Sequence, residues 1–186
     1  MTTGAGQTQR LPDHGLVYAG ARWLPDGKRI VVWAAEPDRP LRLFLHDLGA
    51  GAGRPVPFTP EGVTDWVVSP DGSTAAARGP SPAIRLYAID GSGPRDIPGL
   101  TGQDVPVGWI VGGLLVMRPD DPASALGAIY RVDVATGRQT AWKSVLLRDR
   151  AGLMKFTSFR VTPDGLSHAY SWHRALSSLY LADGLV

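Results

Sequence analysis

The sequence predicts an all-β protein built from four repeated units, and three observations support this prediction. Glycine (23) and proline (16) together make up about a fifth of the 186 residues, which favours many turns and few long helices. A tight-turn motif recurs about every 40–50 residues, a spacing typical of repeat folds. A second, strand-like motif follows each turn at a nearly constant distance.

The tight turns set the register of the repeat. Glycine adopts positive φ without a Cβ clash, and aspartate can hydrogen-bond its own backbone, so Asp-Gly suits a chain reversal. Where proline precedes the pair, it presets φ and ends the strand. The four turns are Asp26-Gly27, Asp71-Gly72, Gly112-Gly113 and Asp164-Gly165.

Apolar side chains stand three and five residues before each turn. A spacing of two residues places them on one face of a strand. We expect the tryptophan and phenylalanine members to pack between neighbouring sheets, as large aromatic side chains usually do. The positions three before the turn are Trp23, Val68, Trp109 and Val161, and those five before it are Ala21, Trp66, Val107 and Phe159.

The second motif predicts another strand about 20 residues beyond each turn. It reads LFLHDL, LYAIDG, IYRVDV and LYLADG, and its aspartates are Asp47, Asp90, Asp133 and Asp183. Each unit therefore has a strand before the turn, a strand after it, the motif strand and a weaker fourth strand. Examples of these predicted strands are 106–111, 29–35, 41–47, 54–58 and 138–147.

Four strands per unit at this period predict a β-propeller of about four four-stranded blades, either small or partial. The predicted blades span about residues 15–62, 63–104, 105–154 and 155–186, after a flexible N-terminal tail at 1–14. The fourth unit stops after its motif strand. We expect residues 15–19 (GLVYA) to supply the missing strand and to close the ring, since closure removes an exposed sheet edge. The alternative is a piece of a larger ring.

The turn and motif strands resemble the TolB-type propeller repeat, whose blades carry a Ser-Pro-Asp-Gly turn and a Leu-Tyr-x-x-Asp strand. The matching stretches are WLPDGKRIVV, SPDGSTAAA, LYAIDG and IYRVDVATGR, and the resemblance covers about residues 20–186. WD-repeat propellers have a similar four-stranded, WD-like blade, but their characteristic Gly-His and Trp-Asp dipeptides are absent from this sequence. The resemblance implies a fold and says little of function.

The last stretch, VTPDGLSHAYSWHRALSSLYLADGLV, resembles the C-terminal propeller of bacterial eukaryotic-like serine/threonine kinases. In that family a kinase domain and usually a membrane span precede the propeller, which has a sensor or scaffold role. The chain has no Gly-rich nucleotide loop, no His-Arg-Asp and no Asp-Phe-Gly, so kinase activity does not carry over. The resemblance implies a bacterial, kinase-associated sensor or scaffold, ending naturally at Val186.

Composition and motifs argue against catalysis and cofactors. The chain has no cysteine and no asparagine, its net charge is +2, and no basic stripe suggests nucleic acid. It lacks the Gly-x-Ser-x-Gly of propeller-bearing hydrolases, and Ser92 reads as a turn residue. The four histidines, His14, His46, His168 and His173, do not have metal-ligand spacing. We therefore expect no enzyme activity, no metal and no cofactor.

Recognition is expected on the face opposite the tight turns, where longer and varied loops join the second and third strands. These loops are 36–40, 79–82, 118–127 and 172–177, and a neighbouring connection spans 147–155. We name Arg118, Trp172, His173 and Arg174 as candidate partner-binding residues.

The sequence thus predicts a non-catalytic propeller that binds a protein or peptide partner. The alternative is the accessory propeller of a prolyl-oligopeptidase-like hydrolase that lacks its catalytic domain. We expect either a homodimer or the completion of a larger propeller, and no direct membrane insertion. No apolar run reaches the ~18 residues of a bilayer span and no signal peptide is seen, so a soluble chain of unassigned compartment is expected. A periplasmic location would require a larger exported or anchored protein.

Overall fold

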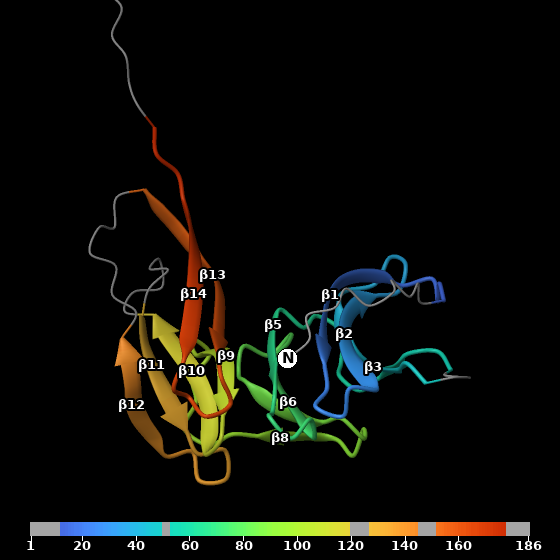
Figure 1. Ribbon diagram of the computed structural model, residues 1–186, viewed down its shortest axis with the longest axis horizontal. Helices are drawn as coiled ribbons and strands as arrows, with labels where there is room; N and C mark the ends of the chain where they lie inside the picture. The colour runs from blue at the N-terminus through green and yellow to red at the C-terminus, as the bar shows by residue number, and fades with distance from the viewer. Residues whose placement is uncertain (1–11, 50–52, 120–126, 145–151, 178–186) are drawn as a thin grey trace, which may run out of the picture.

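The computed structural model describes residues 12–49, 53–119, 127–144 and 152–177. Within these ranges every regular element is a β-strand, and the strands form antiparallel sheets that follow one another along the chain. Figure 1 shows the sheets arranged as an arc, with β1, β5 and β9 toward its middle and β3, β8 and β12 on its outside. In the described ranges, no helix is both long enough and apolar enough to cross a membrane.

The first three sheets each contain four strands in chain order. The first sheet is β1 (Val17–Trp23), β2 (Arg29–Ala35), β3 (Arg42–Asp47) and β4 (Val56–Pro57). The second is β5 (Asp65–Val68), β6 (Thr74–Arg78), β7 (Arg85–Ala88) and β8 (Pro94–Asp96). The third is β9 (Val105–Ile110), β10 (Gly113–Pro119), β11 (Gly127–Val132) and β12 (Gln139–Ser144). Strands therefore pair within the predicted units.

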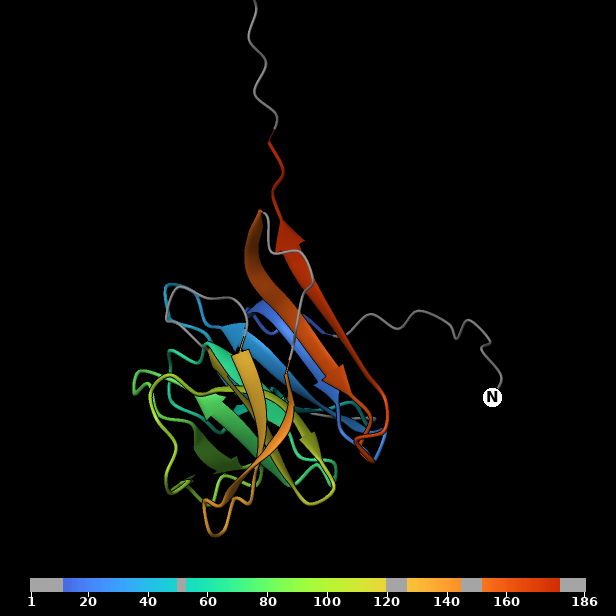
Figure 2. The same cartoon turned by 90° about the vertical axis from the view of Figure 1, so that its left-hand side faces the viewer.

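The fourth sheet consists, in the described ranges, of the hairpin β13 (Leu153–Val161) and β14 (His168–Arg174). The motif strand predicted around Asp183 lies outside the described residues. Figures 1 and 2 show that the end of this hairpin opposite its turn projects beyond the third sheet.

Each predicted tight turn joins the first two strands of a sheet. In the first of them, the Asp26 carboxylate accepts hydrogen bonds from the backbone N–H groups of Lys28 and Arg29, at 2.9 and 3.0 Å. Gly27 follows with φ 65°, a conformation that glycine adopts without steric cost. These bonds are local, so the turn forms wherever the short motif occurs, and this locality explains why the register could be predicted.

Buried apolar side chains gather in clusters between successive sheets, so the sheets bury one another's faces. Between the first and second sheets lie Leu24, Val31, Leu43, Val63, Ala75, Ala77, Tyr87 and Ile89. Between the second and third lie Val67, Ala76, Ile84, Leu86, Ile97, Leu114, Val116 and Val132. Between the third and fourth lie Ile110, Leu115, Met117, Ile129 and Phe159.

The predicted inter-sheet aromatics divide into two groups. Trp66 and Trp109 pack against the first and second clusters, and Phe159 is a member of the third. Trp23, in contrast, is 66% exposed, so the prediction that it packs between sheets is wrong. It pairs with Ile30, on the face of the first sheet that points away from the second sheet, and no described sheet packs there.

The sequence suggested that residues 15–19 complete the fourth sheet, and the structure shows that they do not. Val17 and Tyr18 pair with Ala35 and Ala34, so this stretch begins the first strand of the first sheet. This strand leads directly into the first tight turn, so it forms a hairpin with the next strand of the same unit. The described structure is therefore an arc of sheets, with β1 and β14 in its first and last members (Figure 1).

Candidate functional site

Arg118 lies on β10 rather than in a loop, and its guanidinium is bound within its own sheet. Its Nε donates to Oδ1 of Asp104 at 2.9 Å and its Nη2 donates to Oδ2 at 3.1 Å. The Asp104 side chain is fully buried. Nη2 also donates to Gln139 at 3.1 Å, and the guanidinium lies 5.2 Å from the ring centroid of Tyr130. The hydrogen bond to Asp104 raises the pKa of Arg118. These contacts fix the Arg118 side chain within the third sheet, and we call this arrangement a structural clamp.

The other three predicted residues are the last residues of β14 and so belong to a strand as well. Trp172, His173 and Arg174 pair with Phe156, Lys155 and Leu153 of β13. The hairpin is longer than the sequence indicated, because strand pairing covers residues 172–174 of the loop expected at 172–177. Trp172 is 40% exposed, and its ring centroid lies 5.6 Å from that of Tyr170.

The structure brings the predicted residues to one end of two neighbouring sheets without forming one site. β10 and β14 are both second strands of their sheets and follow the same kind of turn, so Arg118 and Trp172 lie at the end opposite the tight turns. They stand on different sheets, and Arg118 is already bound to Asp104. Whether this end binds a partner stays a prediction.

Three of the four histidines, His14, His46 and His168, make ring contacts. His46 is 2% exposed, and its ring makes an edge contact with that of His14 at 5.3 Å. Burial lowers the pKa of His46, and the charge of His14 lowers it further. His168 stacks on Tyr170 at 6.3 Å, and its Nδ1 lies 3.2 Å from Nζ of Lys143. In the part of the chain that the structure describes, no three His, Asp or Glu side chains are grouped as for a metal ion.

A pocket at the inner edge of the arc brings together an exposed tryptophan and two arginines. Its cavity measures about 610 Å³ and lies between the first tight turn and the second. We call it the arginine pocket, and its lining residues are Ala21, Arg22, Trp23, Leu24, Pro25, Val68, Ser69, Pro70 and Arg160.

The two arginines occupy equivalent positions in the repeat. Each stands four residues before its turn, on the first strand of its sheet, and the matching residues of the other units are Val67 and Gly108. All four line a smaller adjoining cavity of about 180 Å³, so this position converges from every sheet. Only the positions three and five residues before each turn were considered in the sequence, and they lie on one face of the strand. The position four residues before the turn lies on the other face, and the same alignment of the repeats contains it.

Arg22 is partly buried and has no acidic partner among the described residues. Its guanidinium lies 5.2 Å from the ring centroid of Trp66, and its buried Nε has no hydrogen-bond partner among the described residues. Burial lowers the pKa of Arg22, and the positive charge of Arg160 lowers it further. Arg160 is exposed, and its Nη1 donates to the backbone oxygen of Phe159 at 2.8 Å. Within the described ranges neither arginine forms a salt bridge.

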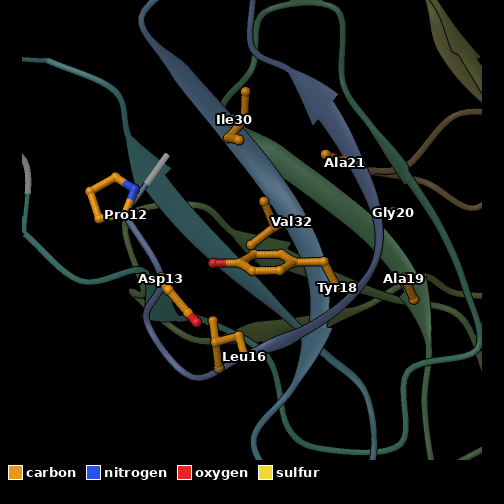
Figure 3. A pocket seen from close by; sticks show the side chains of 9 residues that line it. All are labelled: Pro12, Asp13, Leu16, Tyr18, Ala19, Gly20, Ala21, Ile30 and Val32. Atoms are coloured by element: carbon orange, nitrogen blue, oxygen red, sulfur yellow. The ribbon is translucent and has the colours of Figure 1, made fainter. Parts of the chain in front are cut away.

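A second cavity lies on the free face of the first sheet. Ile30, Val32, Ala34 and Phe44 are buried there beneath Leu16 and Leu48. The cavity measures about 770 Å³, and Figure 3 shows the Tyr18 ring lying across it in front of Val32, with its hydroxyl toward the segment of Pro12 and Asp13. Burial, followed by the charge of Asp13, raises the pKa of Tyr18. The described lining of this cavity is mostly apolar, and Asp13 is the one charged residue in it.

Comparisons with known proteins identify the fold. No family model matches the sequence, and no curated protein matches it. Among solved structures, a protein assigned as TolB from Agrobacterium tumefaciens superimposes with a TM-score of 0.58 at 21% identity, covering 89% of this chain and 64% of its own. An uncharacterized protein from Listeria monocytogenes EGD-e gives 0.49 at 16% identity, covering 76% and 42%. An oligogalacturonate lyase in complex with manganese gives 0.48 at 15%, covering 78% and 49%.

The likeness to the TolB structure concerns the fold. At 21% identity it supports a propeller-type arrangement of antiparallel sheets and carries no activity with it. The chain spans less than two thirds of the length of that structure. Together with the sheet order and the inter-sheet clusters, it confirms the predicted fold class: the chain has an all-β, TolB-like propeller fold.

Proposed function

We propose that this chain is a non-catalytic propeller domain that binds a protein or peptide partner through the arginine pocket. The observation that carries the proposal is that an exposed tryptophan lines one cavity together with two arginines that form no salt bridge among the described residues. Trp23 is 66% exposed at the pocket, next to Arg22. Tryptophan and arginine are the residues most enriched among those that dominate binding energy at protein interfaces.

The surroundings of the pocket favour a preorganised site. Pro25 and Pro70 line it from two tight turns, and their φ angles are restricted by the ring. The turn that carries Pro70 is braced by the Ser69 hydroxyl, which donates to Asp71 at 2.5 Å. A rigid pocket loses little conformational entropy on binding, which favours affinity for an extended peptide.

We further propose that the domain serves a kinase-type system in bacteria. This proposal is supported by the resemblance of the C-terminal stretch, whose residues 161–174 form the last tight turn and β14. The fold also suits a sensor or scaffold role, because propellers present loops on a rigid frame. A kinase reading frame continuous with, or next to, this coding sequence would support the link, and a hydrolase frame there would oppose it.

The partner-binding proposal is tested by selecting a displayed random peptide library on the full 186-residue chain. We expect enrichment of related peptides on the wild-type protein and loss of that enrichment on Trp23→Ala. The matched control is Val56→Ala, which removes a side chain 62% exposed on the outer strand β4. No enrichment on the wild type, or equal enrichment on Trp23→Ala, would refute the proposal.

A further inference from the structure

We propose that the arginine pocket binds an oxyanion, a carboxylate or a phosphoryl group of the ligand, between the guanidinium groups of Arg22 and Arg160. This inference deepens the proposed function and rests on it, because it assigns the chemical class of the group that the partner presents. Arginine is suited to this role, since its planar fork of N–H donors matches the oxygen pairs of carboxylates and phosphates.

The repeat geometry brings the two positive charges together. Arg22 is on β1 and Arg160 on β13, far apart in sequence but equivalent in register, and both line the same cavity. The corresponding residues of the second and third units are Val67 and Gly108, which carry no charge. Two of the four inward positions are therefore cationic, and they belong to the first and last sheets of the arc.

No acidic side chain of the described residues compensates the charges in the pocket. Burial and, after it, the charge of Arg160 lower the pKa of Arg22. The second cause means that each guanidinium raises the free energy of the other in its charged form. No carboxylate of the described residues lines the pocket. Asp71, which follows the lining Pro70, accepts hydrogen bonds from Ser69 and Ser73 within its own turn. Asp26, which follows Pro25, likewise accepts hydrogen bonds from backbone N–H groups of its own turn. A bound anion would remove the repulsion that the protein leaves in place.

Donor groups are available for such an anion. The Nε of Arg22 is buried without a hydrogen-bond partner in the described part of the chain, although it is a donor. An unsatisfied buried donor is costly, and a ligand oxygen would satisfy it. The cavity of about 610 Å³ exceeds the volume of a single oxyanion, so space remains beside Trp23 and Pro25 for the neighbouring part of the ligand.

The test is a titration of the uniformly ¹⁵N-labelled full chain, followed by NMR at the Nε–Hε groups of arginine. The probes are N-acetyl-tetra-alanine with a free C-terminal carboxylate, the same peptide as its amide, and inorganic phosphate. We expect a saturable shift of the Arg22 signal with the free carboxylate, with phosphate, or with both, and none with the amide. A response to one probe alone identifies the source of the oxyanion.

Variants decide whether the two arginines are responsible. Arg160→Gln changes an exposed side chain and is expected to bind the responding probe at least about tenfold more weakly, the loss typical of one charged hydrogen bond. Arg22→Gln combined with Arg160→Gln is expected to abolish saturation. Arg131→Gln, an exposed change on β11, is the matched control and should leave binding intact. A melting curve shows whether each variant is folded, and Arg160→Gln decides the question if the double variant is not.

The outcomes separate this inference from the proposed function. No saturable response on the wild type, equal response to the amide, or undiminished binding by folded Arg160→Gln would overturn the oxyanion site. If the displayed library is still enriched in that case, partner binding stands without it. If a probe saturates but no peptide is enriched, the pocket binds a small anion and the protein-partner proposal fails.

Discussion

Replacing Arg118 by methionine tests whether this residue acts as a structural clamp. The substitution keeps the length and much of the apolar stem but removes the two hydrogen bonds to Asp104 and the one to Gln139. Asp104 would remain fully buried, with Thr101 as its described donor through N–H at 2.7 Å and the hydroxyl at 3.1 Å. The buried carboxylate would therefore lose its counter-charge but keep part of its hydrogen bonding.

The expected cost follows from the burial of the pair. Removing one partner of a buried ion pair costs about 3–5 kcal/mol. The Arg118 side chain is 31% exposed, so water can partly replace it and we expect about 2–3 kcal/mol. For a chain of this length each kcal/mol shifts the melting temperature by about 2–4 °C. Arg118→Met should therefore lower the melting temperature by about 4–12 °C.

The matched control is Arg85→Met on β7. Arg85 pairs with Asp96 at 2.6 Å, but the two side chains are 38% and 76% exposed. Such surface pairs contribute about 0–1 kcal/mol. Urea unfolding and thermal melting of both variants give the comparison. Equal destabilisation by the two substitutions would contradict the clamp, and Arg118→Met combined with Asp104→Leu should recover part of the loss because no buried charge is left unpaired.

Three other predictions concern stability. Turn hydrogen bonds lower the pKa of Asp26 from 3.8 to about 2, so its stabilising effect is complete above pH 4 and should be lost as the pH falls to 2 in urea titrations. Gly137→Ala should destabilise more than Gly27→Ala, since both have positive φ but the new Cβ at 137 would collide with the Pro98 carbonyl; melting curves compare them. Phe159→Ala should cost about 3–5 kcal/mol by chemical denaturation, because the ring is 4% exposed in the third cluster.

The parts of the fold that the sequence predicted well are those determined by local chemistry. The predicted strand 29–35 coincides with β2, and the predicted 106–111 differs from β9 by one residue at each end. Both flank a tight turn, where glycine and neighbouring groups fix the reversal within a few residues. Once the turns are placed, alternation along each strand assigns the side chains to one face or the other.

The parts that were mispredicted depend on what packs against a face. Trp23 lies on the same face of its strand as Trp66 and Trp109 do on theirs, yet it is exposed, because the first sheet has a described neighbour on one side only. Trp172 was predicted to lie in a loop because the turn motif fixes where the β13–β14 hairpin begins but not how many residues pair beyond it. Neither property can be obtained from local patterning, since both depend on the number and arrangement of neighbouring elements.

The same reasoning applies to Arg118, which the sequence named as a candidate, and to Arg22 and Arg160, which it did not name. Arg118 stands near a variable loop in the sequence, and in the structure its Nε and Nη2 groups are engaged by buried Asp104 and by Gln139. Arg22 and Arg160 stand on regular strands, where variability gives no signal, and they share one cavity because the arc curves. In a repeat fold, the register position that faces the common inner edge brings side chains of several units to one cavity, and this convergence is the reason that we propose the oxyanion site there.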